Sequence, residues 1–170
     1  MITLRPMNEL EFQTFLAESI HSYASDKIRS GNWSEDEAER RSIEEHKKLL
    51  YRGLDTPNHF LYTIEFNHKP VGRIWLNSDP KIAGGAGFIY DLYIEEEFRR
   101  QGLATRALHL LEEKASRLGL SRLSLHVFGF NEPAIALYKK LGYKVTNLNM
   151  SKDINGAQPF IIGDASVSLS

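Results

Sequence analysis

The sequence predicts an α/β (α+β) domain built on a mixed, mostly antiparallel sheet flanked by helices. Two helical patterns precede a series of β-rich runs that have no helix between them. A later strand, helix and strand predict a right-handed crossover and one parallel pair. With 170 residues, 42% hydrophobic and 25% charged, the chain has the size and composition of one soluble domain with its own core.

The N-terminal part of the chain predicts a short strand followed by two helices. The strand covers residues 2–5. Segments 8–11 (Asn to Glu) and 34–37 (Ser to Glu) have the spacing of capping boxes, and apolar residues then recur at helical intervals. Gly31 and Gly53 are expected near the ends of these helices.

The next part predicts three antiparallel strands. Residues 60–66 and 71–76 are rich in β-branched and aromatic side chains, and the intervening segment 67–70 indicates a tight hairpin. Segment 77–87 contains a proline and three glycines and predicts a mobile loop. The apolar run 88–94 is expected to be the third strand of this group.

The C-terminal part predicts two further helices, each followed by a strand. The first helix begins near Leu103, and residues 123–128 alternate as in a strand with two different faces. Asn131 is a good N-cap for the second helix. We expect a final strand in 143–153 and a flexible tail over 155–170, so that the domain covers residues 1–154.

Composition limits the function classes. The net charge is −1 without a long basic run, so we expect no nucleic-acid partner. The absence of cysteine excludes disulfides, thiolate ligands and a cysteine nucleophile, and we expect no metal. No window approaches the ~18 apolar residues of a membrane span, and the N-terminus has no signal-peptide core. We therefore expect a cytoplasmic protein without a membrane partner.

A basic, glycine-bearing turn lies between the strand 88–94 and the following helix. Residues 99–104 read Arg-Arg-Gln-Gly-Leu-Ala. Backbone N–H groups at a helix N-terminus lack intrahelical partners and lie at the positive end of the helix dipole, so a pyrophosphate can bind there. Gly102 would let the backbone approach closely. A lone glycine among arginines is more typical of a solvated turn, so the downstream segments decide between these interpretations.

Three segments in this order and spacing carry a stronger signal than any of them alone. They are Arg99-x-x-Gly102-x-Ala104, the preceding Asp91-Leu92-Tyr93-Ile94, and Asn131-Glu132-Pro133-Ala134-x-x-Leu137-Tyr138-x-x-Leu141-Gly142-Tyr143. Together they resemble the GNAT superfamily of acyl-CoA-dependent N-acyltransferases. The resemblance implies six or seven strands, splayed at the centre of the sheet, with about four helices. It also implies transfer of an acetyl group from acetyl-CoA to a primary amine in a ternary complex.

The resemblance assigns roles to particular residues. The amides of the basic turn would hold the pyrophosphate of coenzyme A, the splayed strand would pair with the pantetheine arm, and Asn131 would bond that arm or the acyl end. Tyr138 would protonate the departing thiolate, because a phenol has a pKa closer to that of a thiol than a carboxyl has. The expected coenzyme A contacts are Leu92, Tyr93, Ile94, Arg99, Arg100, Gln101, Gly102, Leu103, Ala104, Thr105, Asn131 and Tyr138.

The general base is less defined. We place Asp91 first, ahead of Tyr93, the acidic segment 95–97 and His126. Three consecutive acids are more often a solvated turn, and a lone strand histidine is more often structural. Tyr138 and Asn131 also have structural interpretations, as a core tyrosine and a helix cap.

Two other functions remain open at this point. A coenzyme A binding or sensing module without transfer activity would keep the cofactor signature. A Rossmann or P-loop nucleotide binder is disfavoured, because the turn lacks Gly-x-Gly-x-x-Gly and Gly-Lys-Ser/Thr.

The amine acceptor is not identified. The resemblance implies that residues 23–33 form one wall of the acceptor site, and Tyr23 and Trp33 either shape this wall or pack in the core. The acidic residues in 35–39 either attract a cationic amine or form a favourable first turn of a helix. A homodimer is an alternative to a monomer.

Overall fold

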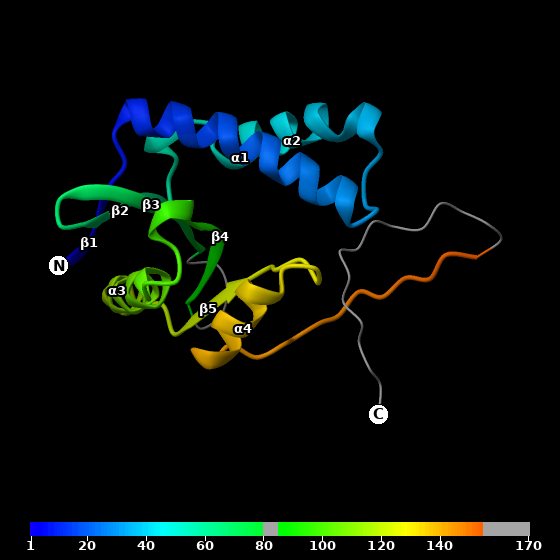
Figure 1. Ribbon diagram of the computed structural model, residues 1–170. Coiled ribbons are helices and arrows are strands. Elements are labelled where there is room, and N and C mark those ends of the chain that lie inside the picture. The colour runs from blue at the N-terminus through cyan, green and yellow to red at the C-terminus, as the bar shows by residue number, and fades with distance from the viewer. Residues whose placement is uncertain (80–84, 155–170) are drawn as a thin grey trace. The chain divides into compact units, whose positions relative to one another are not determined.

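The computed structural model describes residues 1–79 and 85–154, and shows five strands and four α-helices within them (Figure 1). The expected tail, 155–170, lies outside the described residues. The elements are β1 Ile2–Pro6, α1 Glu9–Arg29, α2 Glu35–Leu49, β2 His59–Phe66, β3 Lys69–Asp79, β4 Ala86–Ile94, α3 Leu103–Arg117, β5 Arg122–Leu125 and α4 Glu132–Lys140, with 3-10 turns at Gly53–Asp55 and Glu96–Phe98.

The sheet has the order β1-β2-β3-β4-β5. The first four strands pair antiparallel, and β5 pairs parallel to β4, so the predicted fold class is confirmed. The expected count of six or seven strands is too high for the described residues. Segment 143–154, expected to contain a last strand, has no regular secondary structure there, and its apolar side chains such as Leu148 and Met150 are exposed. A β-rich composition forms a strand only where a neighbour satisfies the backbone and covers one face.

The described residues form two compact units. The first comprises Met1–Leu16 and Lys48–His126, and thus holds the sheet and α3. The second comprises Ala17–Lys47 and the chain from Val127 onward, and thus holds most of α1 and α2 together with α4.

In the first unit the two faces of the sheet have different coverings. α3 packs against β1 and β4, and its buried stripe includes Leu103, Leu108 and Leu111. On the opposite face, Trp75 of β3 meets Phe15 of α1 edge to face, with ring centroids 5.8 Å apart. The side chains that surround this contact are Met7, Phe12, Leu50 and Leu61. Each face of the sheet is therefore part of a separate apolar layer.

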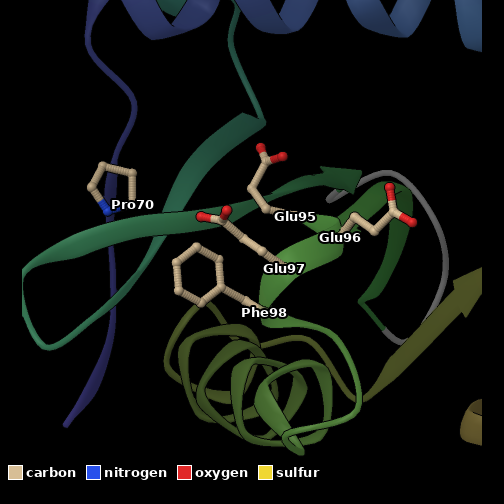
Figure 2. Close-up of a pocket in the computed structure, with 5 residues that line it drawn as sticks. All are labelled: Pro70, Glu95, Glu96, Glu97 and Phe98. Atoms are coloured by element: carbon tan, nitrogen blue, oxygen red, sulfur yellow. The ribbon is translucent and has the colours of Figure 1, made fainter.

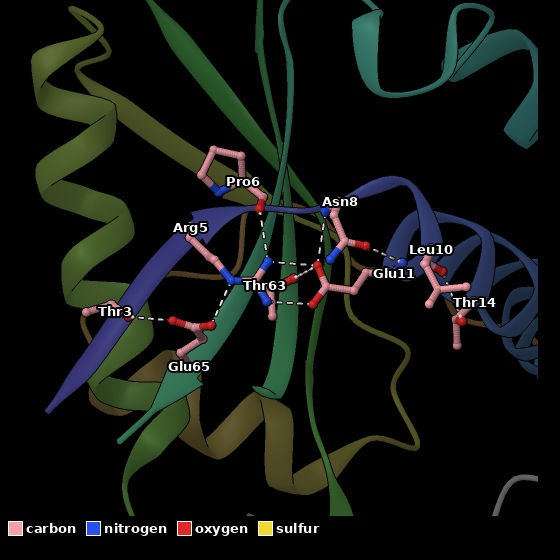
Figure 3. Close-up of polar contacts among 9 residues, drawn as sticks. All are labelled: Thr3, Arg5, Pro6, Asn8, Leu10, Glu11, Thr14, Thr63 and Glu65. Atoms are coloured by element: carbon pink, nitrogen blue, oxygen red, sulfur yellow. Dashed lines mark hydrogen bonds and ion pairs between the residues drawn. The ribbon is translucent and has the colours of Figure 1, made fainter. Parts of the chain in front are cut away.

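The capping box predicted at the start of α1 is confirmed. The Glu11 amide donates to Asn8 Oδ1 at 2.9 Å, and the Asn8 amide donates to the Glu11 carboxylate at 3.0 Å (Figure 3). The Arg5 guanidinium also binds Glu11, at 2.6 Å, and Glu65 of β2, at 2.7 Å. This guanidinium lowers the pKa of Glu11 to about 2. The network ties the first turn of α1 to β1 and β2.

The predicted hairpin between β2 and β3 is also confirmed. Asn67 and His68 both have positive φ, 51° and 66°, as a two-residue type I′ turn requires. β3 is longer than predicted, because pairing with β2 and β4 continues to both sides of the apolar run 71–76. Strand length here follows from the neighbours on both sides and not from local composition.

In the second unit, polar side chains join α1 to α2. Ser42 Oγ donates to the Ile20 carbonyl at 2.7 Å. Buried His46 donates from Nδ1 to the Ser42 carbonyl at 2.8 Å, so its Nε2 accepts from the Ser19 hydroxyl at 2.9 Å. The buried polar atoms of this helix pair therefore have hydrogen-bond partners.

Candidate functional site

β4 extends beyond its parallel neighbour. Pairing with β5 begins at Ala86↔Arg122 and ends at Ile89↔Leu125, although β4 continues to Ile94. In the described part of the chain, residues 90–94 thus have β3 on one side and extend past β5 on the other. Backbone groups on such an edge can pair with an extended ligand, as in β-strand addition.

A β-bulge lies where this extension begins. Trp75 of β3 is opposite Asp91, and the next β3 residue, Leu76, is opposite Ile89. Tyr90 is therefore the extra residue on β4. A bulge changes which side chains reach each face of a strand, and bulges are over-represented next to active sites. As a result, Ile89 and Leu92 lie opposite Leu76 and Ile74 of β3, although three positions separate them along β4.

The turn after β4 is tied to the strand end by Arg99. Its Nε donates to the Ile94 carbonyl at 2.9 Å, and its guanidinium lies 5.3 Å from the ring centroid of Tyr93. Gln101 Nε2 donates to the Glu97 carbonyl at 3.3 Å. Arg100 is exposed and has a φ of 59°. These bonds hold the turn with both arginines at its surface.

The turn ends in an open helix N-terminus. Gly102 is the N-cap of α3, has a φ of 72° and supplies no side-chain cap. The first intrahelical bond of the described residues at this end runs from the Arg106 amide to the Gly102 carbonyl. The amides of Leu103, Ala104 and Thr105 therefore precede the helical hydrogen-bond pattern. A Cβ placed on Gly102 would find no heavy atom within 4 Å, so the space beside this backbone is open to a ligand. The donors, the dipole and the arginines suit a pyrophosphate.

Asp91, the first candidate for the general base, is in an ion pair. Arg73 Nε of β3 donates to Asp91 Oδ2 at 2.7 Å, and the Arg73 side chain is only 12% exposed. The same guanidinium lies 4.5 Å from the Tyr93 ring centroid and 5.5 Å from that of Phe15. One oxygen of the carboxylate is therefore held by a nearly buried cation.

Asn131 and Tyr138 belong to the second unit, whereas the other expected coenzyme A contacts and the base candidates belong to the first. Asn131 is confirmed as the N-cap of α4, because its Oδ1 accepts from the Ala134 amide at 3.3 Å. Tyr138 is half-buried on α4 and meets Tyr143 edge to face at 5.5 Å. Both residues have structural roles in α4, and these roles leave open a further part in binding or chemistry.

Of the other base candidates, Tyr93 is half-buried, and the rest lie at the surface. The acidic segment Glu95, Glu96 and Glu97 lines an open hollow of about 640 Å³ together with Pro70 and Phe98. Figure 2 shows Glu97 and Phe98 on the side of Pro70, whereas Glu96 points the other way. All three glutamates are exposed, as is His126, which follows the end of β5 and is not in the strand as predicted. Strand β5 ends earlier because its pairing with β4 stops at Leu125.

Comparison with known proteins identifies the family to which this chain belongs. The model of the acetyltransferase (GNAT) family matches residues 21–143. The chain belongs to the GNAT acetyltransferase family. Two Bacillus subtilis (strain 168) proteins described as uncharacterized N-acetyltransferases are similar to it. YdgE is 40% identical over 153 residues, which cover 89% of this chain and 98% of YdgE. YycN is 37% identical over 154 residues, covering 90% and 99%.

A solved structure supports the same assignment. The crystal structure of YycN from Bacillus subtilis superposes with a TM-score of 0.88 at 36% identity, and the match covers 91% of this chain and 99% of that one. The mixed sheet and four helices are therefore the GNAT fold. Among the described residues, no helix is long and apolar enough to cross a membrane, and no group of three or more potential ligand side chains could hold a metal.

The sequence did not predict two features beside β4 in this GNAT domain. One is Arg73, the partner of Asp91. The other is a cluster of rings formed by His59, Trp75, Phe88 and Tyr90. Strand pairing and the bulge determine both, and neither leaves a spacing pattern in the sequence. By contrast, Tyr23 and Trp33 pack edge to face at 5.3 Å within the second unit, in agreement with the packing interpretation.

Proposed function

We propose that this GNAT domain, residues 1–154, transfers an acetyl group from acetyl-CoA to a primary amine by direct attack in a ternary complex. The observation that carries the proposal is the open N-terminus of α3. It follows a left-handed glycine with free space beside it, and the basic turn connects it to the strand that extends beyond β5. Membership of an acetyltransferase family supports the same activity.

The donor would bind mainly to backbone groups. The amides of residues 103–105 would receive the pyrophosphate, with Arg99 and Arg100 adding positive charge and Gln101 and Gly102 shaping the turn. The pantetheine arm would lie along residues 92–94, where β4 extends past β5. Asn131 uses its side-chain oxygen for the cap of α4, so its NH₂ group would be the end that meets a carbonyl of the arm.

The chemical step needs one proton donor and one proton acceptor. The amine nitrogen forms a bond to the thioester carbon and loses a proton, and the carbon–sulfur bond breaks. We assign the thiolate proton to the Tyr138 hydroxyl and the amine proton to Asp91, directly or through water. Asp91 Oδ1 would accept this proton while Arg73 holds Oδ2. A backbone N–H of the extended β4 segment would stabilise the oxyanion.

A second function has one observation in its favour. The carboxylate of Asp91 is already engaged by Arg73, whereas the turn that would bind coenzyme A has open donors. A domain that binds or senses coenzyme A without transfer would have this combination. The two functions differ in turnover and not in affinity for coenzyme A.

Calorimetric titration with acetyl-CoA tests the proposal, with desulfo-CoA and NAD as comparators. We expect acetyl-CoA to bind with a Kd on the order of micromolar, and NAD not to bind. A screen of amines for release of free coenzyme A thiol then separates the two functions. Binding with thiol release supports the acetyltransferase, and binding without release to any amine supports the sensing module. A folded protein, free of copurified coenzyme A, that binds none of these ligands contradicts both.

A further inference from the structure

The sheet face opposite α3 carries a connected group of rings beside the extended part of β4. We call His59, Trp75, Phe88 and Tyr90 the aromatic shelf. Trp75 and Tyr90 stack with ring centroids 4.6 Å apart and an interplanar angle of 26°. Phe88 meets Tyr90 edge to face at 4.8 Å, and His59 lies 5.7 Å from Trp75. Three neighbouring strands thus contribute to one apolar surface.

Hydrogen bonds and burial hold this shelf in one arrangement. Trp75 is only 3% exposed and rests on Phe15. Its Nε1 donates to His59 Nδ1 at 2.9 Å, which leaves the proton of the neutral imidazole on Nε2. A ligand would therefore meet a preformed surface and would not have to order it, which favours affinity.

Tyr90 is the accessible part of the shelf. As the bulged residue, it is 40% exposed, although one of its faces is stacked on a buried tryptophan. It lies next to Asp91 in the chain and at the start of the segment that extends past β5. The exposed ring is thus on the same strand as residues 92–94, along which the proposed pantetheine arm would lie.

The charges on and around the shelf indicate what kind of ligand it can bind. Burial lowers the pKa of His59 and raises the pKa of Tyr90, so both side chains are neutral near pH 7. The neighbouring charges, Arg73 and Asp91, neutralise each other at 2.7 Å. A polyamine or aminoglycoside carries several cationic groups and would need several carboxylates. A neutral aromatic surface instead matches a ligand with an apolar or aromatic body.

We propose that the aromatic shelf binds the body of the acetyl acceptor, and that this acceptor is a primary monoamine with an aromatic or apolar body. Tyr90 is the main contact, and Trp75 and His59 position it. The inference rests on the proposed acetyl transfer and specifies its acceptor. Tyr90 takes part in acceptor binding only. Acetyl-CoA would still bind at residues 99–105, which we call the donor turn.

The test compares acceptors and variants in steady-state kinetics. The acceptors are 2-phenylethylamine and spermidine, and the variants are Tyr90→Ala and Tyr90→Phe. Tyr51→Ala is the matched control, because Tyr51 is 66% exposed and lies outside the shelf. Calorimetry of acetyl-CoA with each variant checks that folding and the donor site are retained. Titration of 2-phenylethylamine into the protein saturated with coenzyme A gives a second readout that does not depend on turnover.

We expect the wild type to prefer 2-phenylethylamine over spermidine in kcat/KM by about tenfold or more. Tyr90→Ala should raise the KM and Kd for 2-phenylethylamine about tenfold with unchanged affinity for acetyl-CoA, whereas Tyr90→Phe and Tyr51→Ala should stay within about twofold. Equal KM values in wild type and Tyr90→Ala, or a preference for spermidine, would overturn the inference alone. A wild type that binds acetyl-CoA but acetylates no amine would overturn the proposed function, and the inference with it.

Discussion

The donor turn at residues 99–105 and the aromatic shelf lie at two ends of the same strand extension, and they are built differently. The turn uses backbone amides, one left-handed glycine and exposed arginines. The shelf uses rings from three strands, of which Trp75 is buried and Tyr90 is exposed. Backbone recognition depends on local chain geometry, whereas the shelf depends on register and packing. The proposed donor site thus depends on a few adjacent residues, whereas the proposed acceptor site depends on the pairing of three strands.

Changing Gly102 to Glu should have the largest effect of these substitutions, because it blocks the proposed pyrophosphate site in the donor turn. The variant adds a side chain and a negative charge where the pyrophosphate is expected. We expect affinity for acetyl-CoA, measured by calorimetry, to fall on the order of 1,000-fold.

Gly119→Glu is the matched control for Gly102→Glu. Gly119 also has a positive φ, 78°, and open space around its Cβ position, but it follows the C-terminal end of α3. It therefore carries the same backbone strain without a donor site. Equal losses of affinity in the two variants would mean that strain in α3, and not the anion site, explains the effect.

Replacing Tyr138 by Phe tests the proposed acid and distinguishes transfer from sensing. Loss of the hydroxyl should lower kcat about 300-fold, because protonation of the leaving thiolate is lost, with the Kd for acetyl-CoA unchanged. Stopped-flow or steady-state thiol release measures the rate, and Tyr51→Phe is the exposed control. Unchanged turnover in Tyr138→Phe would remove this residue from the acid role.

Asp91→Asn tests whether Asp91 is the general base. Since Asn keeps an oxygen for Arg73 but cannot take a proton at neutral pH, we expect kcat/KM to fall about 100-fold. A variant with normal rates and a lower free energy of unfolding would show that Asp91 serves only to hold Arg73.

Glu11→Gln should have the smallest effect on activity and a measurable one on stability. The folded pKa of Glu11, about 2, lies below its usual value of 4.5, so its ion pair stabilises the protein fully above pH 4.5 and is lost as the pH falls toward 2. We expect the variant to be less stable than wild type by about 2 kcal/mol at pH 7 and equally stable near pH 2. Urea unfolding at several pH values measures the difference.

The control for Glu11→Gln is Glu44→Gln, which removes an exposed pair with Arg40 on α2. It should change the free energy of unfolding by less than about 0.5 kcal/mol. A stability difference in Glu11→Gln that does not depend on pH between 2 and 7 would contradict the role of the charged pair.

The sequence predicted the parts of the fold that depend on local chemistry. The capping box of α1, the hairpin at Asn67–His68 and the start of α3 after Gly102 depend on particular residues at fixed spacings. The β-rich runs without a helix between them also predicted the antiparallel strands, and the later strand, helix and strand predicted the parallel pair. These signals act within a few residues, so a single sequence contains them.

The sequence did not predict what depends on contacts between distant segments. Whether 143–153 forms a strand depends on a neighbour, and composition alone overestimated it. The bulge at Tyr90 shifts the face of every following β4 residue, and no residue type marks its position. The Arg73 and Asp91 pair and the Trp75 to His59 hydrogen bond follow from that register.

The most direct test of the proposed donor site is a titration of isotope-labelled protein with acetyl-CoA, followed through the backbone amide resonances. If the N-terminus of α3 binds the donor, the largest shifts should be at Arg100 to Thr105, with a second group at residues 92–94. Saturable binding with unchanged resonances at 103–105, and the largest shifts elsewhere, would contradict the donor site on which the proposed function rests.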